Sequence, residues 1–250
     1  MNPIEIFKME CQEAILSQRG DSEAHRLSNA WISYPGLHRY SYNFSWLGRP
    51  IIQYPQDIVA MQELIYSVQP DLIIETGIAH GGSLILYASL LELNALCGGQ
   101  QNAHILGIDI DIRKHNREAI EAHPMFKRGR ITMLEGSSIG ADMVAKVHEF
   151  AAPYKRVMVL LDSNHTHAHV LAELEAYASL VAVGSYCVVF DTIVEYMPED
   201  AYPDRPWGKG NNPMTAVDGY LKDHPEFILD EIMDAKLMIS VAPRGYLKRI

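Results

Sequence analysis

The chain has 250 residues, of which 48% are apolar, and its 31 acidic residues outnumber its 21 basic ones for a net charge of −10. This length and composition predict one large globular α/β domain and exclude a disordered chain. The acidic balance argues against a nucleic-acid-binding surface, which would need a basic stripe, and no apolar stretch has the length of a bilayer span.

Residues 1–45 precede the regular pattern and form a predicted helical and aromatic cap. Apolar residues near helical spacing predict one or two helices over residues 3–30, with Gly20 as a stop. We expect this segment to cap the fold or to form an oligomer contact. It lacks the basic region and apolar run of a signal peptide, and the three cysteines have no metal-ligand spacing, so we expect a cytoplasmic protein.

Aromatic residues, glycine and proline dominate residues 31–57. An irregular segment with this many rings must lie against another part of the protein. Packing across the edge of a sheet and forming a lid over a substrate site are both compatible with the pattern.

Strands alternate with helices after a first helix at residues 58–68, which Pro70 ends. The expected strands are 71–75, 104–111, 130–136, 156–162 and 185–191. The expected helices between them are 84–96, 113–123, 138–150 and 170–181. This alternation predicts a doubly wound, mostly parallel sheet with helices on both faces.

The regular pattern ends after Asp191. Residues 193–213 contain four prolines and predict a long loop, and a loop of this length inside a compact domain usually has a function. A helix at 215–222 and two strands, at 226–231 and 236–242, are expected to follow. Residues 245–250 are expected to form a short tail, or to extend the last strand.

The turn after the first strand runs from Glu75 to Gly82, and its glycines do not have the G-x-G-x-x-G spacing of a dinucleotide site. The carboxylate of Glu75 would repel a diphosphate, whereas it would attract an ammonium or sulfonium group. The turn therefore favours S-adenosylmethionine over a dinucleotide. The turn residues expected to border this cofactor are Gly77, His80, Gly81 and Ser83.

The next two strands supply further candidate cofactor contacts. Asp109 can accept both hydroxyls of a ribose, or it can cap the following helix together with Asp111. Ser138 follows the third strand, where it can cap a helix, contact an adenine, or do both.

Two neighbouring strands end in Asp162 and Asp191, and the turn after Asp162 is rich in histidine. Carboxyl ends of parallel strands meet at one edge of a sheet, which is where open α/β folds bind ligands. Two carboxylates at this edge predict a divalent cation with oxygen ligands, such as Mg²⁺.

Several motifs resemble the cephalosporin hydroxylase family: WLGRPIIQYPQD, IIETGIAHGGS, GIDIDIR, LLDSNHTHAHVLAEL and VVFDT with RPWGKGNNP. The resemblance covers residues 46–250 and implies a Rossmann-like class I methyltransferase domain. In that fold, seven mostly parallel strands form the sheet and the last strand is antiparallel. A fainter similarity extends to magnesium-dependent macrolide sugar O-methyltransferases.

The resemblance also implies residue roles. Asp162 and Asp191 match metal ligands, His165 matches a general base, and Glu75 and Asp109 match positions that hold the methionine part and the ribose of the cofactor. A carboxylate of the family pattern is replaced here by Phe190. The metal site is then completed by water, completed by Asn164, His167 or Glu195, or absent.

The implied reaction is O-methylation of a hydroxyl on a saccharide or a glycosylated small molecule, in surface-polysaccharide or natural-product synthesis. A cation acidifies the hydroxyl, and His165 removes its proton near neutral pH. His167 and His169 are either surface or packing residues. In the long loop, Lys209 either binds an anionic substrate or lies in solvent, and Trp207 is a candidate for stacking on a sugar.

Three rival functions remain. The NHTHAH stretch has the histidine density of metallohydrolases, but Ala168 stands where their signature needs an aspartate. An iron-dependent hydroxylase would use a histidine and a carboxylate as ligands. The third rival, a protein that binds S-adenosylmethionine without catalysis, is suggested by Phe190.

Overall fold

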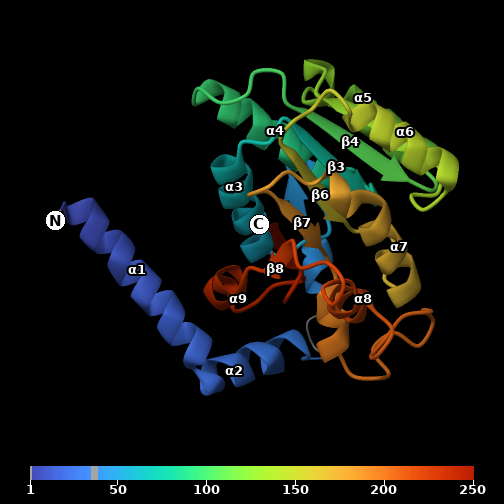
Figure 1. The fold of residues 1–250 in the computed structure, drawn as a ribbon. Helices are drawn as coiled ribbons and strands as arrows, with labels where there is room; N and C mark the ends of the chain where they lie inside the picture. Colours follow the sequence, from blue (N-terminus) through green and yellow to red (C-terminus); the bar gives the residue numbers. More distant parts are fainter. Residues whose placement is uncertain (1, 35–38) are drawn as a thin grey trace.

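The computed structural model describes residues 2–34 and 39–250. Within them, seven strands form one sheet in the order β5-β4-β3-β6-β7-β9-β8 (Figure 1). The strands are β3 (Leu72–Thr76), β4 (His104–Asp109), β5 (Ile131–Glu135), β6 (Val157–Leu161), β7 (Tyr186–Val189), β8 (Phe227–Leu229) and β9 (Tyr246–Arg249). β3 to β7 pair in parallel, and β9 is antiparallel to both of its neighbours. The predicted Rossmann-like sheet with an antiparallel last strand is therefore confirmed.

The last part of the chain differs from the prediction. Residues expected as a strand at 236–242 form the end of α9 (Glu231–Leu237) and a loop, whereas the expected tail forms β9. The side chain of Asp230 accepts a hydrogen bond from the Met233 amide and so caps α9. The loop after α9 is fixed by the buried carboxylate of Asp57, which accepts hydrogen bonds from Ser240 Oγ and the Val241 amide.

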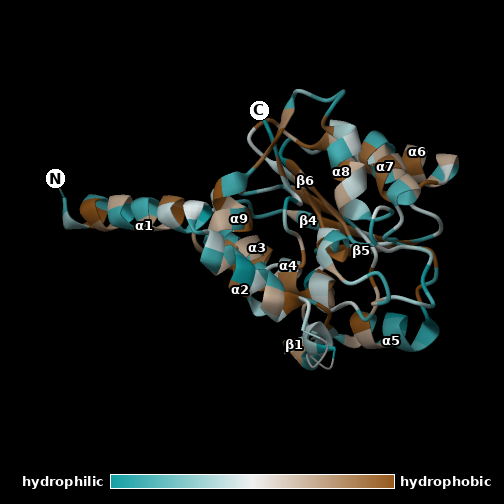
Figure 2. Ribbon diagram, turned by 90° about the horizontal axis from the view of Figure 1, so that it is seen from below, coloured by the Kyte–Doolittle hydropathy of each residue, from teal (hydrophilic) through white to brown (hydrophobic). Residues whose placement is uncertain are grey.

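Helices cover both faces of the sheet and bury its alternating side chains. One face carries α3 (Pro55–Val68), α4 (Gly82–Leu96), α5 (Lys114–Ala122) and α9, packed on residues such as Ile73 and Leu160. The other face carries α6 (Ala141–Ala151), α7 (His167–Tyr177) and α8 (Pro213–Tyr220), packed on residues such as Ile74 and Leu161. Apolar strands between more polar helices are visible in Figure 2.

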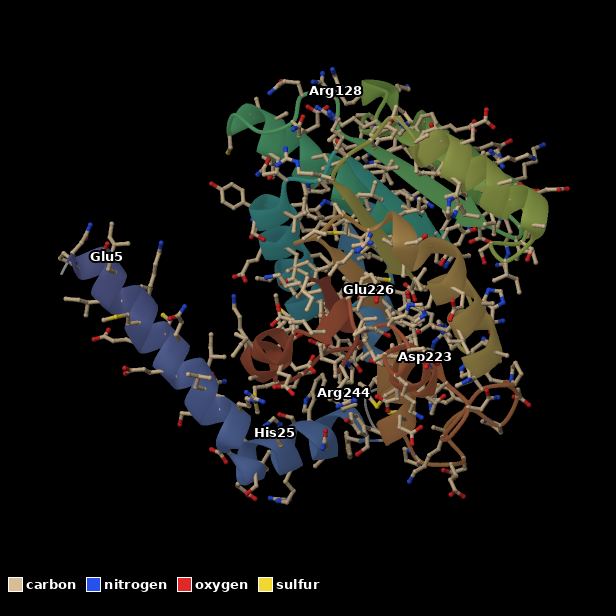
Figure 3. All side chains as sticks on the ribbon, viewed as in Figure 1. Glu5, His25, Arg128, Asp223, Glu226 and Arg244 are labelled. Carbon is tan, nitrogen blue, oxygen red and sulfur yellow. The ribbon has the colours of Figure 1, made fainter. Side chains whose placement is uncertain are left out.

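The N-terminal helices are α1 (Pro3–Gly20) and α2 (Ser22–Ile32). Asp21 ends the first and caps the second, because its side chain accepts the Glu23 and Ala24 amides. α1 has no buried residue and points away from the sheet, so that Glu5 lies far from the rest of the molecule (Figure 3). None of the helices in residues 2–34 and 39–250 is long and apolar enough to cross a membrane.

The aromatic segment forms a short helical turn, η2 (Tyr40–Asn43), and a hairpin of β1 (Phe44–Trp46) and β2 (Arg49–Ile51). The Tyr40 ring packs edge-on against Trp31, Phe44 and Tyr54, with ring centroids 5.0 to 5.6 Å apart. The Trp46 indole donates to Ser89 of α4 at 2.9 Å. Residues 35–38 of this predicted segment lie outside the described residues.

Candidate active site

The predicted site residues meet in a pocket of about 510 Å³ at the carboxyl edge of the parallel strands. Of the candidate residues, those that line it are Gly77, His80, Ser83, Asp109, Asp162, His165 and Asp191. Glu75 and Ser138 are buried close to this edge but are not lining residues, and Gly81 lies in the turn beside it. Segments far apart in the sequence, from Gly77 to Asp191, thus line one pocket.

Glu75 ends in a carboxyl group with almost no contact with solvent, since the residue is 1% exposed. Burial raises its pKa to about 8, the nearby charge of Asp109 adds to this rise, and Ser83 opposes it. Its Oε2 atom has no hydrogen-bond partner. A buried carboxyl oxygen without a partner is costly, so this position fits a ligand that brings a cationic donor.

The turn after β3 needs glycine for two separate reasons. Gly77 has φ +93°, a conformation that other residues rarely adopt. A Cβ atom at this position would lie 2.1 Å from the carbonyl oxygen of Asp162. The turn therefore packs directly against the backbone of Asp162, the residue that follows β6.

Asp109 holds this turn in place instead of capping a helix. Its Oδ2 accepts the amides of Ile78 and Ala79 at 2.8 and 3.2 Å, and its Oδ1 accepts the Asp111 amide at 3.1 Å. α5 starts after Arg113 and has no side-chain cap. The capping interpretation of Asp109 and Asp111 is therefore wrong, and the ribose contact remains a prediction.

Two residues that fix the same turn were missed in the sequence. The Arg49 guanidinium, brought by β2, donates to the His80 carbonyl oxygen. The Asn116 amide, on α5, donates to the Ala79 carbonyl oxygen at 2.9 Å. Arg49 lies within a motif that carried the family resemblance, so a signal existed, whereas Asn116 is recognisable only from the fold.

Asp162, His165 and Asp191 form the polar centre of the pocket. One potential ligand atom from each residue lies within 4.8 Å of those of the other two. Nε2 of His165 is 3.1 Å from Oδ2 of Asp191. Burial raises the pKa of Asp162 well above its usual value, and the charges of Asp191 and Glu75 raise it further. Such a set of oxygen and nitrogen donors, destabilised by its own negative charge, fits a divalent cation.

The position of Asp191 depends on the loop after α9. Asp191 has φ +54° and starts η5 (Thr192–Tyr196). The Ile193 amide donates to the Val241 carbonyl oxygen, and the Thr192 hydroxyl donates to the Pro243 carbonyl oxygen. Through these bonds, the loop around residues 239–245 fixes the turn that carries this carboxylate.

The three residues considered as substitutes for the missing carboxylate are engaged elsewhere. Asn164 accepts the Thr166 amide, His167 Nδ1 contacts Thr215 Oγ1, and Glu195 accepts the Gly210 amide. None of them belongs to the three-residue cluster in the described part of the chain. Phe190 is 1% exposed and packs in the core. In the described residues, His165 is thus the third polar group that the cluster offers.

Ser138 belongs to a hydrogen-bonded network under the pocket. α6 is capped at Gly140, so the prediction that Ser138 caps it is wrong. Its hydroxyl lies 3.2 Å from Nε2 of His169, and the Ser163 hydroxyl lies at the same distance from that atom. Ser163 also donates to the buried Glu173 at 2.6 Å. His169 is therefore a packing residue, and the contact of Ser138 with adenine remains a prediction.

The long loop brings an aromatic ring and a cation to the pocket. Trp207 packs edge-on against His165 with ring centroids 4.8 Å apart, and the Arg205 guanidinium lies 5.2 Å from the Trp207 centroid. Arg205 and Lys209 are both exposed, but only Arg205 lines the pocket. Burial and the nearby Asp191 raise the pKa of Tyr202, also in this loop, to about 12.

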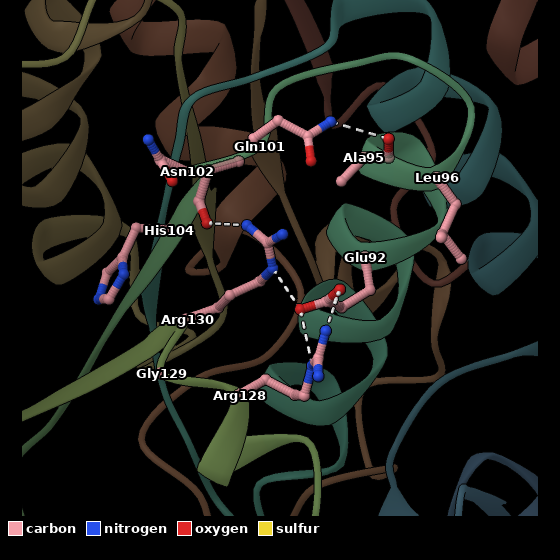
Figure 4. A pocket seen from close by; sticks show the side chains of 10 residues that line it. Glu92, Ala95, Leu96, Gln101, Asn102, His104, Arg128, Gly129 and Arg130 are labelled. Carbon is pink, nitrogen blue, oxygen red and sulfur yellow. Dashed lines mark hydrogen bonds and ion pairs between the residues drawn. The ribbon is translucent and has the colours of Figure 1, made fainter.

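A second cavity, of about 600 Å³, lies at the opposite edge of the sheet, near the start of β4 (Figure 4). Its two arginines, Arg128 and Arg130, both donate to the carboxylate of Glu92. His104 there contacts the Thr132 hydroxyl. The polar groups of this cavity are largely paired with one another, and it is remote from the strand ends that form the active-site pocket.

Comparison with known proteins places the chain among methyltransferases. Residues 38–250 match the family described as Rhamnosyl O-methyltransferase/CmcI. A rhamnosyl O-methyltransferase of Mycobacterium bovis is 26% identical over 195 residues, which cover 77% of this chain and 73% of that protein. The rhamnosyl O-methyltransferase of Mycobacterium leprae is 25% identical and covers 82% of both chains.

Solved structures agree with the fold. A CmcI structure with Mg and SAM matches with a TM-score of 0.58 and 19% identity, over 88% of this chain and 83% of that one. An O-methyltransferase from Bacillus cereus in complex with SAH matches with a TM-score of 0.51 and 14% identity, over 85% and 81%. At these identities the likeness establishes the fold alone.

Proposed function

The chain belongs to the Rhamnosyl O-methyltransferase/CmcI family, and we propose that it transfers the methyl group of S-adenosylmethionine to a hydroxyl of a saccharide or glycosylated small molecule with the help of a divalent cation. The family found from the sequence motifs is confirmed. The rhamnosyl O-methyltransferases of mycobacteria support a sugar as the acceptor. The observation that carries the proposal is the position of Glu75, at a glycine turn that touches Asp162.

The methyl donor occupies the ends of β3 and β4 in this proposal. Glu75, ionised on binding, holds the ammonium group of the donor through the oxygen that has no partner in the protein. Asp109 accepts the ribose hydroxyls, and Gly77 admits the donor close to the backbone. The role of these residues is to bind the donor and aim its sulfonium toward β6.

The acceptor occupies the ends of β6 and β7. Asp162 and Asp191 would hold the cation, and a cation bound there would supply Lewis-acid polarisation of the acceptor hydroxyl. Oδ2 of Asp191 orients the imidazole of His165 at 3.1 Å. His165 would take the hydroxyl proton as the oxygen forms a bond to the methyl carbon, while the bond from that carbon to the sulfonium sulfur breaks and the neutral thioether leaves. The Trp207 ring beside His165 supplies an apolar wall for a sugar face.

We also propose that the N-terminal helices, α1 and α2, mediate homo-oligomer formation. The support is α1, which has no buried residue and exposes Ile4 by 63% and Phe7 by 65%. Three cysteines without disulfide partners support a cytoplasmic location. Sedimentation of the wild type and of an Ile4→Ser, Phe7→Ser double variant tests the oligomer, which the double variant should lose.

The test of the reaction is calorimetry with S-adenosylmethionine, with and without Mg²⁺, followed by mass spectrometry of saccharides incubated with both. We expect binding of the donor and a methylated product that requires the cation. Failure to bind the donor at high protein concentration contradicts the proposal. Binding without transfer to any hydroxyl favours a non-catalytic binding protein, and oxygen-dependent hydroxylation with Fe²⁺ favours the hydroxylase.

A further inference from the structure

Arginines without partners gather at the active-site pocket. The chain has twelve arginines. Within the described residues, eight of them donate to a carboxylate or to a backbone carbonyl oxygen. The other four have no such partner there: Arg39, Arg113, Arg156 and Arg205. Three of these four, all except Arg156, line the active-site pocket.

This distribution is unexpected for the charge of the protein. With ten more acidic than basic residues, the chain has enough carboxylates to pair every arginine. The pocket itself contains Asp111, Asp162 and Asp191, yet none of its three free guanidinium groups is paired with them in the described part of the chain. A guanidinium presents planar donors that match a carboxylate or phosphate group. Unpaired arginines at a pocket opening therefore indicate an anionic ligand.

Two of the arginines are held on aromatic rings at the acceptor side. The Arg39 guanidinium lies 4.0 Å from the Tyr42 centroid, and that of Arg205 lies over Trp207, whose ring touches His165. A cation held on a ring keeps its donors available for a ligand. The Trp207 ring thus lies between Arg205 and His165, and Arg205 lines the same pocket as Asp162 and Asp191.

The two arginines come from segments that lie near each other. Arg39 and Tyr42 line the same pocket as Arg205 and Trp207, so the turn that carries Arg39 lies near the loop that carries Arg205. Arg205 comes from the loop that follows β7, and β6 lies between β7 and the ends of β3 and β4, where we place the donor. Arg113 follows β4 and so belongs to the donor side.

We propose that the acceptor is an acidic saccharide, whose carboxylate or phosphate group is bound by Arg39 and Arg205 while its hydroxyl lies at His165. This inference rests on the proposed function and adds the class of acceptor. The carboxylates of Asp162 and Asp191 do not oppose it, because a divalent cation compensates them. Arginines at the mouth of a cleft also raise the local concentration of an anionic substrate.

The experiment measures saccharide binding to the full chain loaded with S-adenosylhomocysteine and Mg²⁺, by saturation-transfer NMR and calorimetry. The probes are matched pairs that differ in one charged group: methyl glucoside with methyl glucuronide, and the same pair in the galacto and manno series. The corresponding sugar 1-phosphates form a third arm, which separates a phosphate from a carboxylate as the recognised group.

We expect the acidic sugars to bind about 5- to 30-fold more tightly than the neutral ones, the range for a charge-assisted contact at a partly exposed site. Arg205→Gln should abolish most of this preference, and Arg205→Lys should restore part of it. Arg156→Gln is the matched control, because this unpaired arginine lines a different cavity at the other edge of the sheet. It should retain the full preference.

Equal affinity for neutral and acidic sugars, or no affinity for either, overturns the inference. A preference that survives Arg39→Gln and Arg205→Gln together also overturns it. The proposed function has its own readout, since it fails if S-adenosylhomocysteine does not bind or if bound saccharides are never methylated. A methylated neutral sugar with no acidic preference leaves the proposed function intact and removes only the acidic acceptor.

Discussion

Replacing Glu75 with glutamine should make the protein more stable at alkaline pH and weaker in binding its methyl donor. The buried Glu75 carboxyl has a pKa of about 8 in the folded state, compared with 4.5 for an ordinary glutamate. Because the folded state holds this proton more tightly than the unfolded state, the contribution of Glu75 to the free energy of unfolding is highest below pH 4.5. It falls as the pH rises to about 8. Each pKa unit corresponds to about 1.4 kcal/mol, so a few kcal/mol are lost over this range.

The amide in the Glu75→Gln variant would stay neutral and would not lose this stability. We expect the free energy of unfolding of the variant to lie within about 1 kcal/mol of the wild-type value at pH 5 and to exceed it by about 2–4 kcal/mol at pH 8. Urea denaturation followed by circular dichroism at both pH values measures the difference. Glu135→Gln is the matched control, since Glu135 also ends a parallel strand but is exposed. It should leave the pH dependence unchanged.

The Glu75→Gln substitution should also weaken the binding of the methyl donor. Loss of one charge-assisted hydrogen bond to an ammonium group costs about 10- to 100-fold in affinity. For the wild type, the affinity for S-adenosylmethionine should also rise between pH 6 and 8, because the Glu75 carboxyl group must ionise to bind the ammonium group. Calorimetry with S-adenosylmethionine checks both effects. If Glu75→Gln and the wild type showed the same pH dependence of stability, the buried neutral carboxyl would be refuted, and equal donor affinity would refute its role as ammonium partner.

Three further substitutions test other parts of the site. Gly77→Ala should destabilise the protein by more than about 2 kcal/mol, because of its positive φ and the contact with the Asp162 carbonyl oxygen. Gly98→Ala is the control in thermal unfolding: Gly98 also has a positive φ but has open space around it, so the difference between the two variants measures the contact. Asp162→Asn should raise the melting temperature without metal by about 2–4 °C, because repulsion among carboxylates is relieved, and should abolish stabilisation by Mn²⁺ in the same assay. His165→Asn should lower kcat by about 100- to 10,000-fold without changing donor affinity, and an equal loss of donor affinity would contradict a role as base.

The meeting of residues at the ends of β3, β4 and β6 could be predicted from the sequence because the signals are local. Glu75, Asp109 and Asp162 each stand at the end of an apolar run, and parallel strands bring such ends together without knowledge of the strand order. The glycines were also readable as positions of close backbone approach. The hydrogen bonds that Asp109 accepts from the turn could not be predicted, because a carboxylate shortly before a helix is equally expected to cap that helix.

The acceptor side depends on contacts between distant segments, and there the sequence was less informative. Two loop cations, Lys209 and Arg205, look alike in sequence, and only the fold decides which one lines the pocket. The wrong prediction of a strand at residues 236–242 has a similar cause. The largely apolar residues 236–242 do not reveal which part of the protein they pack against. The cap of α9 at Asp230 and the hydrogen bond from the Val241 amide to the buried Asp57 favour a helix end and a loop there.

The division of the pocket along β6 has a consequence for how such proteins diversify. The donor half is built from strand ends and a glycine turn, where most substitutions would disturb the sheet. In the proposed acceptor half, Arg205 and Trp207 come from a surface loop, and Arg39 and Tyr42 of the same pocket come from a second one; such loops tolerate insertion and change far better. New acceptors can therefore be acquired by exchanging these two loops between relatives while the methyl-transfer apparatus is inherited intact. A chimera that carries a relative's loops on this sheet is a practical route to a methyltransferase of chosen specificity.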